Sequence, residues 1–392
     1  TMVPTSVSQI IEQLINAIVS VGAAWLFIEW FAGNETEEAI YGAAGGTLGT
    51  GAGVVAGLLF MVFVFVVNRK EIQRRIDNDY TVEVESYKEI FRTILMMVTP
   101  VIFSTCIYNL SSYLDQSFFA PLMMTNGWKA DDITIQYGIF SGQYMVMINI
   151  PIALANAAST AVLPSVSGNF AVGDVEGARH KINEAIQMTM FLCIPAAVGM
   201  CVLADPIMHL LFPSTTALAG KLLMAGAVSV IFYSLSTITN GVLQGIGKPS
   251  LPVRHAALSL VINVAVLAVL TKFTPLGIYS VMIATIAYSL AMCILNGRSV
   301  TKHLDYHMDI SNMFLRPLAA AVLMGGAAVV VYYGLHRVIP SNVICLLPAI
   351  LVAVVVYGLG YLYIAHPSKE LLRRFPGGSY LVKIAVKLKV YR

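Results

Sequence analysis

Long apolar segments alternate with short polar connections along the whole chain. As a helix, each segment is long enough to cross a hydrocarbon core of ~30 Å, which takes about 20 residues. The pattern therefore predicts ten membrane-spanning helices, at about residues 5–32, 41–67, 92–124, 134–165, 179–212, 218–245, 252–272, 275–296, 313–336 and 342–365.

The composition agrees with this pattern. Hydrophobic residues make up 57% of the chain and charged residues 11%, whereas soluble domains carry about 25% charged residues. The predicted fold is an all-α polytopic membrane protein. The five cysteines lie scattered in apolar segments without metal-ligand spacing, and the sequence contains no nucleotide-binding loop and no nucleophile–base pattern. We expect neither an enzyme nor a resident cofactor or metal centre.

The basic residues are divided unevenly between the two sides of the predicted membrane. All but four of the 24 Lys and Arg residues fall on connections of one side, and the other side receives only Lys129, Lys221, Lys272 and Arg337. Because connections rich in Lys and Arg stay inside the cell, both ends of the chain are predicted to be cytoplasmic. The tail at 367–392 alternates apolar and basic residues and is expected on the anionic inner leaflet.

The first two predicted helices resemble the seventh and eighth. Pro4 and Pro252 open the first helix of each pair, and Asn16 and Asn263 follow them at similar spacing. Such parallel repeats are typical of transporters. The chain also begins without Met, and we expect that four earlier helices are missing. The predicted parts are the end of a first bundle (1–68), a linker (69–91), a second six-helix bundle (92–297), a loop (298–312), two further helices (313–366) and a tail (367–392).

A single carboxylate, Asp115, lies inside the third apolar segment. Asn109 and Gln116 accompany it and give this helix a polar face. An acidic residue in a membrane helix costs several kcal/mol unless it faces water, an ion or a partner. We therefore predict a cavity-lining helix of a transporter, while a hydrogen bond to a neighbouring helix or a position at the membrane surface would also accommodate Asp115.

Three further features have a functional and a structural interpretation. Glu12 and Asn16 form a polar patch that suits either a cavity or the headgroup layer. Pro151 and Pro164 interrupt the fourth helix and are candidate hinges, because each frees a backbone carbonyl. A run of glycines four residues apart, from Gly45 to Gly57, predicts close helix packing.

Several motifs resemble a known family. These are VPTSVSQIIEQLINAIVS at 3–20, IPIALANAASTAVLPSVS at 150–167, LADPIMHLLFP at 203–213 and NGVLQGIGKPSLPV at 240–253. They look like polysaccharide-export flippases of the multidrug/oligosaccharidyl-lipid/polysaccharide exporter superfamily, and most like the stage V sporulation protein B branch, which is related to the lipid II flippases. The family has fourteen helices in two bundles plus two, so this chain would correspond to helices five to fourteen.

The resemblance implies a function and a set of partners. It implies transport of an undecaprenyl-diphosphate-linked sugar, such as a peptidoglycan precursor, across the bacterial plasma membrane by alternating access. It also implies that the arginines that hold the diphosphate lie largely in the missing helices. Membrane lipids are the other expected partners, nucleic acid is not one, and the protein is expected to be a monomer.

The resemblance also implies a cation site. Related flippases build one from an acid, a polar residue and a threonine at the positions of Asp115, Asn263 and Thr285. A second acid of the family pattern is replaced here by Leu267. Since hard cations require several oxygen ligands, coupling to Na⁺, coupling to H⁺ and no coupling all remain open.

Three rival interpretations fit the same sequence. A multidrug and toxin extrusion antiporter would use the acidic and aromatic residues near Asp115 to bind organic cations. A membrane scaffold would recruit cell-wall synthases without transporting anything. The chain by itself would be an inactive fragment if half a bundle is missing.

Overall fold

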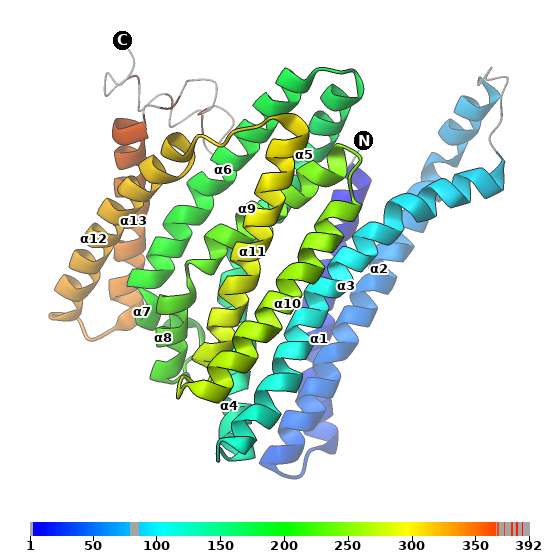
Figure 1. Ribbon diagram of the computed structural model, residues 1–392. Helices are drawn as coiled ribbons and strands as arrows, with labels where there is room; N and C mark the ends of the chain where they lie inside the picture. Colours follow the sequence, from blue (N-terminus) through cyan, green and yellow to red (C-terminus); the bar gives the residue numbers. More distant parts are fainter. Residues whose placement is uncertain are drawn as a thin grey trace. The chain divides into compact units, whose positions relative to one another are not determined.

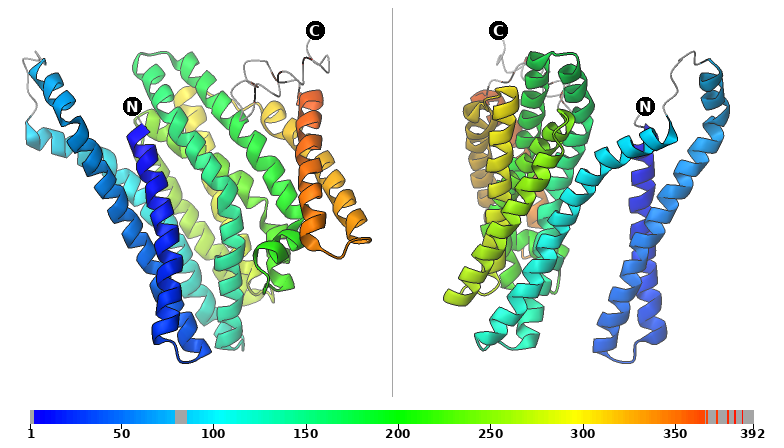
Figure 2. Two further views of the ribbon diagram at one scale, coloured as in Figure 1. Left: turned by 180° about the vertical axis from the view of Figure 1, so that it is seen from behind. Right: turned by 45° about the vertical axis from the view of Figure 1, so that its right-hand side comes forward.

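The computed structural model describes residues 3–78 and 86–365, together with positions 367, 372, 378, 382 and 386. Most of the basic tail and part of the linker expected at 69–91 lie outside these residues. The described elements are all helical, and the chain divides into two units, Thr1–Tyr87 and Lys88–Arg392. Figures 1 and 2 show the helices of each unit running roughly parallel or antiparallel to one another.

The first unit is a hairpin of two long helices. α1 covers Val3–Phe31 and α2 covers Glu35–Asp77, so that α2 continues well beyond the predicted end at 67. Asn34 begins α2 as its N-cap, because its side-chain oxygen accepts a hydrogen bond from the backbone N–H of Glu37 at 2.9 Å. This satisfies one of the donors that a helix start leaves unpaired.

Glycines form the contact between the two helices of the hairpin. Gly45, Gly49, Gly53 and Gly57 are the buried residues of α2 among those whose burial is described. A Cβ atom on Gly49 would lie 2.5 Å from the backbone oxygen of Asn16, and one on Gly53 would lie 2.7 Å from that of Glu12. The backbones therefore touch, and the prediction that this glycine run serves packing is confirmed. We call these four glycines the glycine seam.

The second unit contains the remaining helices. In chain order they are α3 (Tyr87–Thr125), α4 (Ala130–Ile139), the π-helical η1 (Phe140–Tyr144), α5 (Met145–Ala171), α6 (Val175–Val202), α7 (Ala204–Leu211), α8 (Ala217–Gly226), α9 (Ser229–Gly245), α10 (Ser250–Phe273), α11 (Tyr279–Leu304), the π-helical η2 (Ser311–Leu315), α12 (Arg316–His336) and α13 (Asn342–Ala365).

Fewer helices qualify as spans than the ten predicted. Among the described residues, eight helices are long and apolar enough to cross a membrane, and the pair α8–α9, bent by 50°, brings the number to as many as nine. α3 is not among them, and its polar residues gather around Asp115. A multi-pass helical protein is thus confirmed, whereas the tenth span stays a prediction. The helix expected at 179–212 is broken at Leu203, where α6 ends before α7 begins.

Two hydrophobic cores hold the second unit together. One joins α6 and α9 to α12 and α13, and the hydroxyl of Tyr357 in α13 donates to the backbone oxygen of Phe191 in α6 at 2.8 Å. The other joins α3, α4, α5, α8, α10 and α11. Within α3, the buried residues recur every fourth position, at Ser111, Asp115, Phe119 and Met123. This stripe places the carboxylate of Asp115 on the face that packs into the second core.

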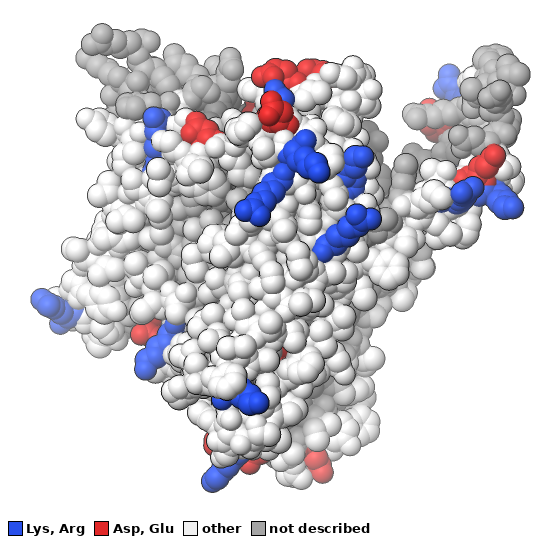
Figure 3. Space-filling view, viewed as in Figure 1, with Lys and Arg blue, Asp and Glu red and all other residues white. Residues whose placement is uncertain are grey.

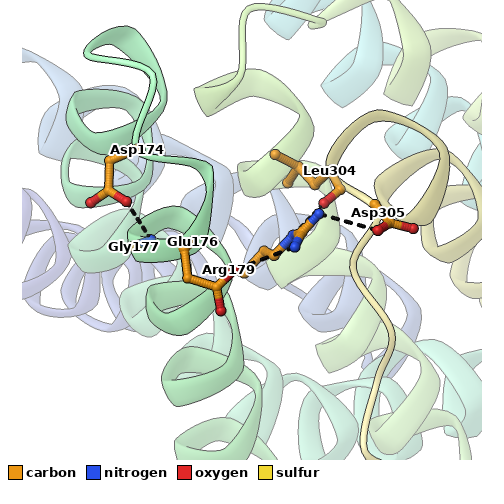
Figure 4. Close-up of polar contacts among 6 residues, drawn as sticks. All are labelled: Asp174, Glu176, Gly177, Arg179, Leu304 and Asp305. Atoms are coloured by element: carbon orange, nitrogen blue, oxygen red, sulfur yellow. Dashed lines mark hydrogen bonds and ion pairs between the residues drawn. The ribbon is translucent and has the colours of Figure 1, made fainter.

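Figure 4 shows how α6 and α11 are joined where α11 ends. Arg179 of α6 donates from Nε to the backbone oxygen of Leu304 at 2.6 Å, and its Nη2 lies 3.3 Å from a carboxylate oxygen of Asp305. Asp305 adopts a left-handed conformation with φ of 47°, which ends the helix. A guanidinium here also complements the negative end of the α11 dipole.

The glycine seam generates a testable expectation. A methyl group on Gly49 would overlap the backbone of α1, whereas a methyl group on Gly51 would meet no atom within 4 Å. Gly49→Ala should therefore destabilise the hairpin by about 1–3 kcal/mol, the usual cost of overpacking. Gly51→Ala is the control and should be neutral or slightly stabilising. Thermal unfolding of both purified variants measures the difference, and equal melting temperatures would contradict the seam.

Candidate functional site

A cavity with both polar and apolar lining residues lies within the second unit. Its volume is about 540 Å³, and residues from α5, α9, α10 and α11 line it. We call it the α5–α9–α11 cavity. The lining residues are Asn149, Ile152, Ala153, Asn156, Ser159, Thr160, Leu163, Tyr233, Ser236, Thr237, Asn240, Gly241, Gln244, Ala256, Tyr288 and Met292. Amides and hydroxyls dominate its polar part, and none of the described residues that line it is acidic or basic.

α5 contributes one polar face to the cavity. Asn149, Asn156 and Thr160 recur at helical spacing, and all three side chains are exposed. The hydroxyl of Thr160 donates to the backbone oxygen of Asn156 at 2.9 Å, which leaves the hydroxyl oxygen available as an acceptor. Two exposed carboxamides on a membrane-length helix require water or a polar ligand beside them, so the cavity accounts for this face.

α9 contributes the facing wall. Ser236, Asn240 and Gln244 recur every fourth residue, so they lie on one side of the helix. Gly241 lets α9 approach α5 closely, because a Cβ atom there would lie 2.2 Å from the hydroxyl oxygen of Ser159. That hydroxyl donates to the backbone oxygen of Thr237 at 3.3 Å. The two walls are thus joined by a direct contact beside the cavity.

A chain of hydrogen bonds connects this cavity to the N-terminal end of α10. Asn240 accepts from Nδ2 of Asn296 in α11 at 2.7 Å, and Oδ1 of Asn296 lies 2.7 Å from Nδ1 of His255 in α10. The other ring nitrogen of His255 lies 3.2 Å from the hydroxyl of Ser299. Asn296 is fully buried, so its amide is held in one orientation. We call Asn240, Asn296, His255 and Ser299 the amide relay.

A second group of buried polar residues lies near the middle of α10. Asp115 is 4% exposed and Asn263 is fully buried, and their side chains face each other between α3 and α10. Yet Oδ1 of Asp115 and both side-chain polar atoms of Asn263 make no hydrogen bond to a described residue. Tyr137 of α4 also lies near Asp115, while its hydroxyl donates to the backbone oxygen of Ser112 at 3.0 Å.

The remaining residues of the predicted cation site are arranged differently. Thr285 is buried in α11, but its hydroxyl donates to the backbone oxygen of Val281 at 2.9 Å. Leu267 is fully buried in α10 and supplies no oxygen ligand. Asn109 and Gln116 are exposed and do not share the buried stripe of Asp115. The structure thus brings Asp115 and Asn263 together, whereas the hydroxyl of Thr285 is bonded within its own helix.

The other predicted residues lie in the hairpin and in α5. Glu12 and Asn16 are partly buried where α1 meets the glycine seam, and Ser20 donates to the side-chain oxygen of Asn16 at 3.0 Å. Pro151 and Pro164 lie inside α5, which continues through both without a break. Pro151 is buried, and its backbone oxygen accepts from Sγ of Cys193 at 3.7 Å.

Sequence reasoning missed the α9 wall and the amide relay. The signal for the wall was present, because Ser236, Asn240 and Gln244 interrupt an apolar helix at intervals of four. The relay had no comparable signal. His255 and Asn296 lie 41 positions apart, and only the antiparallel packing of α10 against α11 brings them together.

Comparison with known proteins defines the class to which this fold and site belong. A family model described as "Lipid II flippase MurJ" matches residues 11–353. The lipid II flippase MurJ of Bacillus subtilis is 26% identical over 387 residues, which cover 96% of this chain and 70% of that protein. Stage V sporulation protein B of the same organism is 23% identical, with the same coverage of both chains.

A further relative matches a shorter part of the chain. A probable low-salt glycan biosynthesis flippase of Haloferax volcanii is 28% identical over 136 residues, or 35% of this chain and 28% of that protein. The class is therefore that of polytopic flippases for lipid-linked precursors, which are transporters rather than enzymes. The chain belongs to the lipid II flippase MurJ family and is an integral, multi-pass protein of the plasma membrane.

Proposed function

We propose that this protein flips a lipid-linked oligosaccharide or peptidoglycan precursor from the inner to the outer leaflet of the plasma membrane. The α5–α9–α11 cavity carries the proposal, because it places a polar wall inside an otherwise apolar bundle. The sugar headgroup of such a lipid needs a polar path through a medium in which unpaired polar groups cost several kcal/mol. The names of the relatives support the same substrate class.

Alternating access is the mechanism that we propose for this step. Two bundles that rock against each other expose a central site first to one side and then to the other. Pro151 and Pro164 are proposed as hinges of α5, because each lacks the N–H that would bind the carbonyl four residues earlier. The freed carbonyls let α5 bend along the wall of the cavity without breaking a hydrogen bond.

We further propose that Asp115 and Asn263 form the coupling site. Unpaired polar atoms buried in protein are costly, and a bound cation or a proton on Asp115 would satisfy them. Asp115, Asn263 and the hydroxyl oxygen of Thr285 would supply the oxygen ligands to Na⁺. Leu267 makes this set smaller than a hard cation prefers, which leaves a proton as the alternative occupant.

The proposed topology places α3 in the membrane as the tenth span and both ends of this chain in the cytoplasm. Figure 3 shows Lys and Arg side chains gathered toward both ends of the visible helices over α10 and α11, with an uncharged surface between them. Lys248, Arg254 and Lys302 lie in the connections and helix ends assigned to the inside, whereas Lys129 and Lys272 are assigned to the outside.

Reconstitution tests the proposed function. The purified full chain in liposomes should move a fluorescent lipid II analogue between leaflets several-fold faster than protein-free liposomes do, as measured by dithionite quenching. Fluorescent phosphatidylcholine is the control and should not move faster. Export of an organic cation without movement of the lipid II analogue would favour a cation antiporter, and movement of neither would favour a scaffold.

Substitution of Asp115 tests the coupling site. Asp115→Asn keeps the shape of the side chain but removes its charge and its proton site. We expect lipid II movement to fall about 10-fold and to lose its dependence on an imposed Na⁺ or pH gradient. Asp131→Asn is the matched control, since Asp131 is exposed at the start of α4, and it should keep the gradient dependence. A gradient response that survives Asp115→Asn would overturn this assignment.

Labelling from outside tests the topology. Lys129→Cys and Lys302→Cys, each in a chain whose exposed Cys106 is replaced by serine, place a thiol at opposite ends of the helices. A membrane-impermeant maleimide should label position 129 in intact cells and position 302 only after permeabilisation. The reverse pattern would invert the proposed orientation, and labelling of both positions in intact cells would mean that one of the helices between them does not cross the membrane.

A further inference from the structure

The α5–α9–α11 cavity has an unusual chemical character for a protein that handles a diphosphate lipid. Its polar groups are carboxamides and hydroxyls, and within the part of the chain that the structure describes, neither Lys, Arg, Asp nor Glu lines it. A diphosphate placed here would lack a compensating cation, which is strongly unfavourable in a partly desolvated site. An organic cation would likewise lack an acidic partner. The lining therefore favours an uncharged ligand rich in hydrogen-bonding groups.

We propose that this cavity is a subsite for the uncharged sugar rings of the translocated lipid, separate from the place that holds the diphosphate. The inference rests on the proposed function and deepens it, because it assigns one part of the substrate to named residues. A volume of about 540 Å³ lies within the range of roughly 300–1,000 Å³ for small-molecule sites. The cavity is large enough for one or two sugar rings.

The amide relay fixes which hydrogen-bonding group the cavity presents. Nδ2 of Asn296 donates to Oδ1 of Asn240 and, at 3.4 Å, to the backbone oxygen of Ser236. Its Oδ1 must then accept from His255, so Nδ1 of His255 carries a proton, and Nε2 lies within hydrogen-bonding distance of the Ser299 hydroxyl. Oδ1 of Asn240 accepts the bond from Asn296, and the NH₂ group of Asn240 is the donor that this residue offers to the cavity.

The other wall offers complementary groups. Asn149, Asn156 and Thr160 present carboxamides and a hydroxyl oxygen from α5. A sugar ring with hydroxyl or N-acyl substituents carries both donors and acceptors, and it can bond to both walls at once. A bare phosphate has acceptors only and would leave the carbonyl groups of the α5 wall without a partner.

Two aromatic rings border the same cavity. Tyr233 and Tyr288 have ring centroids 6.3 Å apart with planes inclined by 34°. Their exposed fractions are 6% and 2%, so both rings are held rigidly in the core beneath the cavity. Flat apolar ring faces beside amide groups suit the C–H faces and the hydroxyl rim of a sugar.

Binding of two lipids that differ only in the sugar tests the proposal. The probes are undecaprenyl diphosphate and the same lipid carrying an N-acetylglucosamine disaccharide, and native mass spectrometry of the purified full chain measures their affinities. The wild type should bind the glycosylated lipid at least about 10-fold more tightly. Asn240→Ala should reduce this ratio several-fold and leave the affinity for undecaprenyl diphosphate unchanged. Equal affinities in the wild type would overturn the proposal.

A matched pair of threonine variants separates a local effect from a general one. Thr160 lines the cavity, whereas Thr134 in α4 does not, and each hydroxyl donates to the backbone oxygen four residues earlier at 2.9 Å. Thr160→Val should lower the preference for the glycosylated lipid, and Thr134→Val should leave it unchanged. Equal losses in both variants would contradict a cavity subsite.

A competition experiment needs no variant. Free N,N′-diacetylchitobiose should displace the glycosylated lipid from the wild type but leave bound undecaprenyl diphosphate in place, and displacement of both lipids or of neither would contradict the subsite.

Different results would contradict the flippase function and the sugar subsite. If the wild type moves neither lipid across a membrane, the flippase function is wrong. If it moves the glycosylated lipid yet binds both lipids equally, only the sugar subsite is wrong.

Discussion

The cost of an unpaired polar group in apolar surroundings governs the organisation of this protein. In hydrocarbon such a group costs several kcal/mol, and with 57% hydrophobic residues the chain has few polar groups to pair. It meets the constraint in two ways. The buried amide of Asn296 is bonded to both Asn240 and His255, and the exposed amides of α5 face a cavity. Asp115 and Asn263 lie close together, but Oδ1 of Asp115 and both side-chain polar atoms of Asn263 lack a hydrogen bond of normal geometry among the described residues. This makes the pair the candidate site for an exchangeable occupant.

The two cores give this arrangement a fixed frame. α6 belongs to the first core through its contact with α13, and Arg179 at its other end holds the last carbonyl of α11. α11 in turn carries Asn296 and Tyr288 toward the cavity. The position of the cavity wall therefore depends on contacts made outside it, and the helices that border the cavity are held from more than one side.

The sequence predicted the features that depend on local patterns. Apolar length located most helices, and glycine spacing identified the seam, because both follow from the geometry of a single helix. The prediction that Asp115 and Asn263 lie close together came from the resemblance to a known family and not from a local pattern. By contrast, the break at Leu203 and the amide relay depend on how neighbouring helices pack. His255 reads as an ordinary residue near a helix start, and nothing near it in the chain indicates that Asn296 will be its partner.

The glycine seam has a thermodynamic consequence for the hairpin. A glycine has no side-chain rotamers to lose when two helices associate, so a contact made by four of them carries little penalty in side-chain conformational entropy. α1 and α2 can remain paired although none of the described side chains of α1 is fully buried. A larger interface of leucines would hide more surface but would also immobilise more torsions. The association of α1 with α2 therefore depends on a small loss of side-chain conformational entropy more than on a large buried surface.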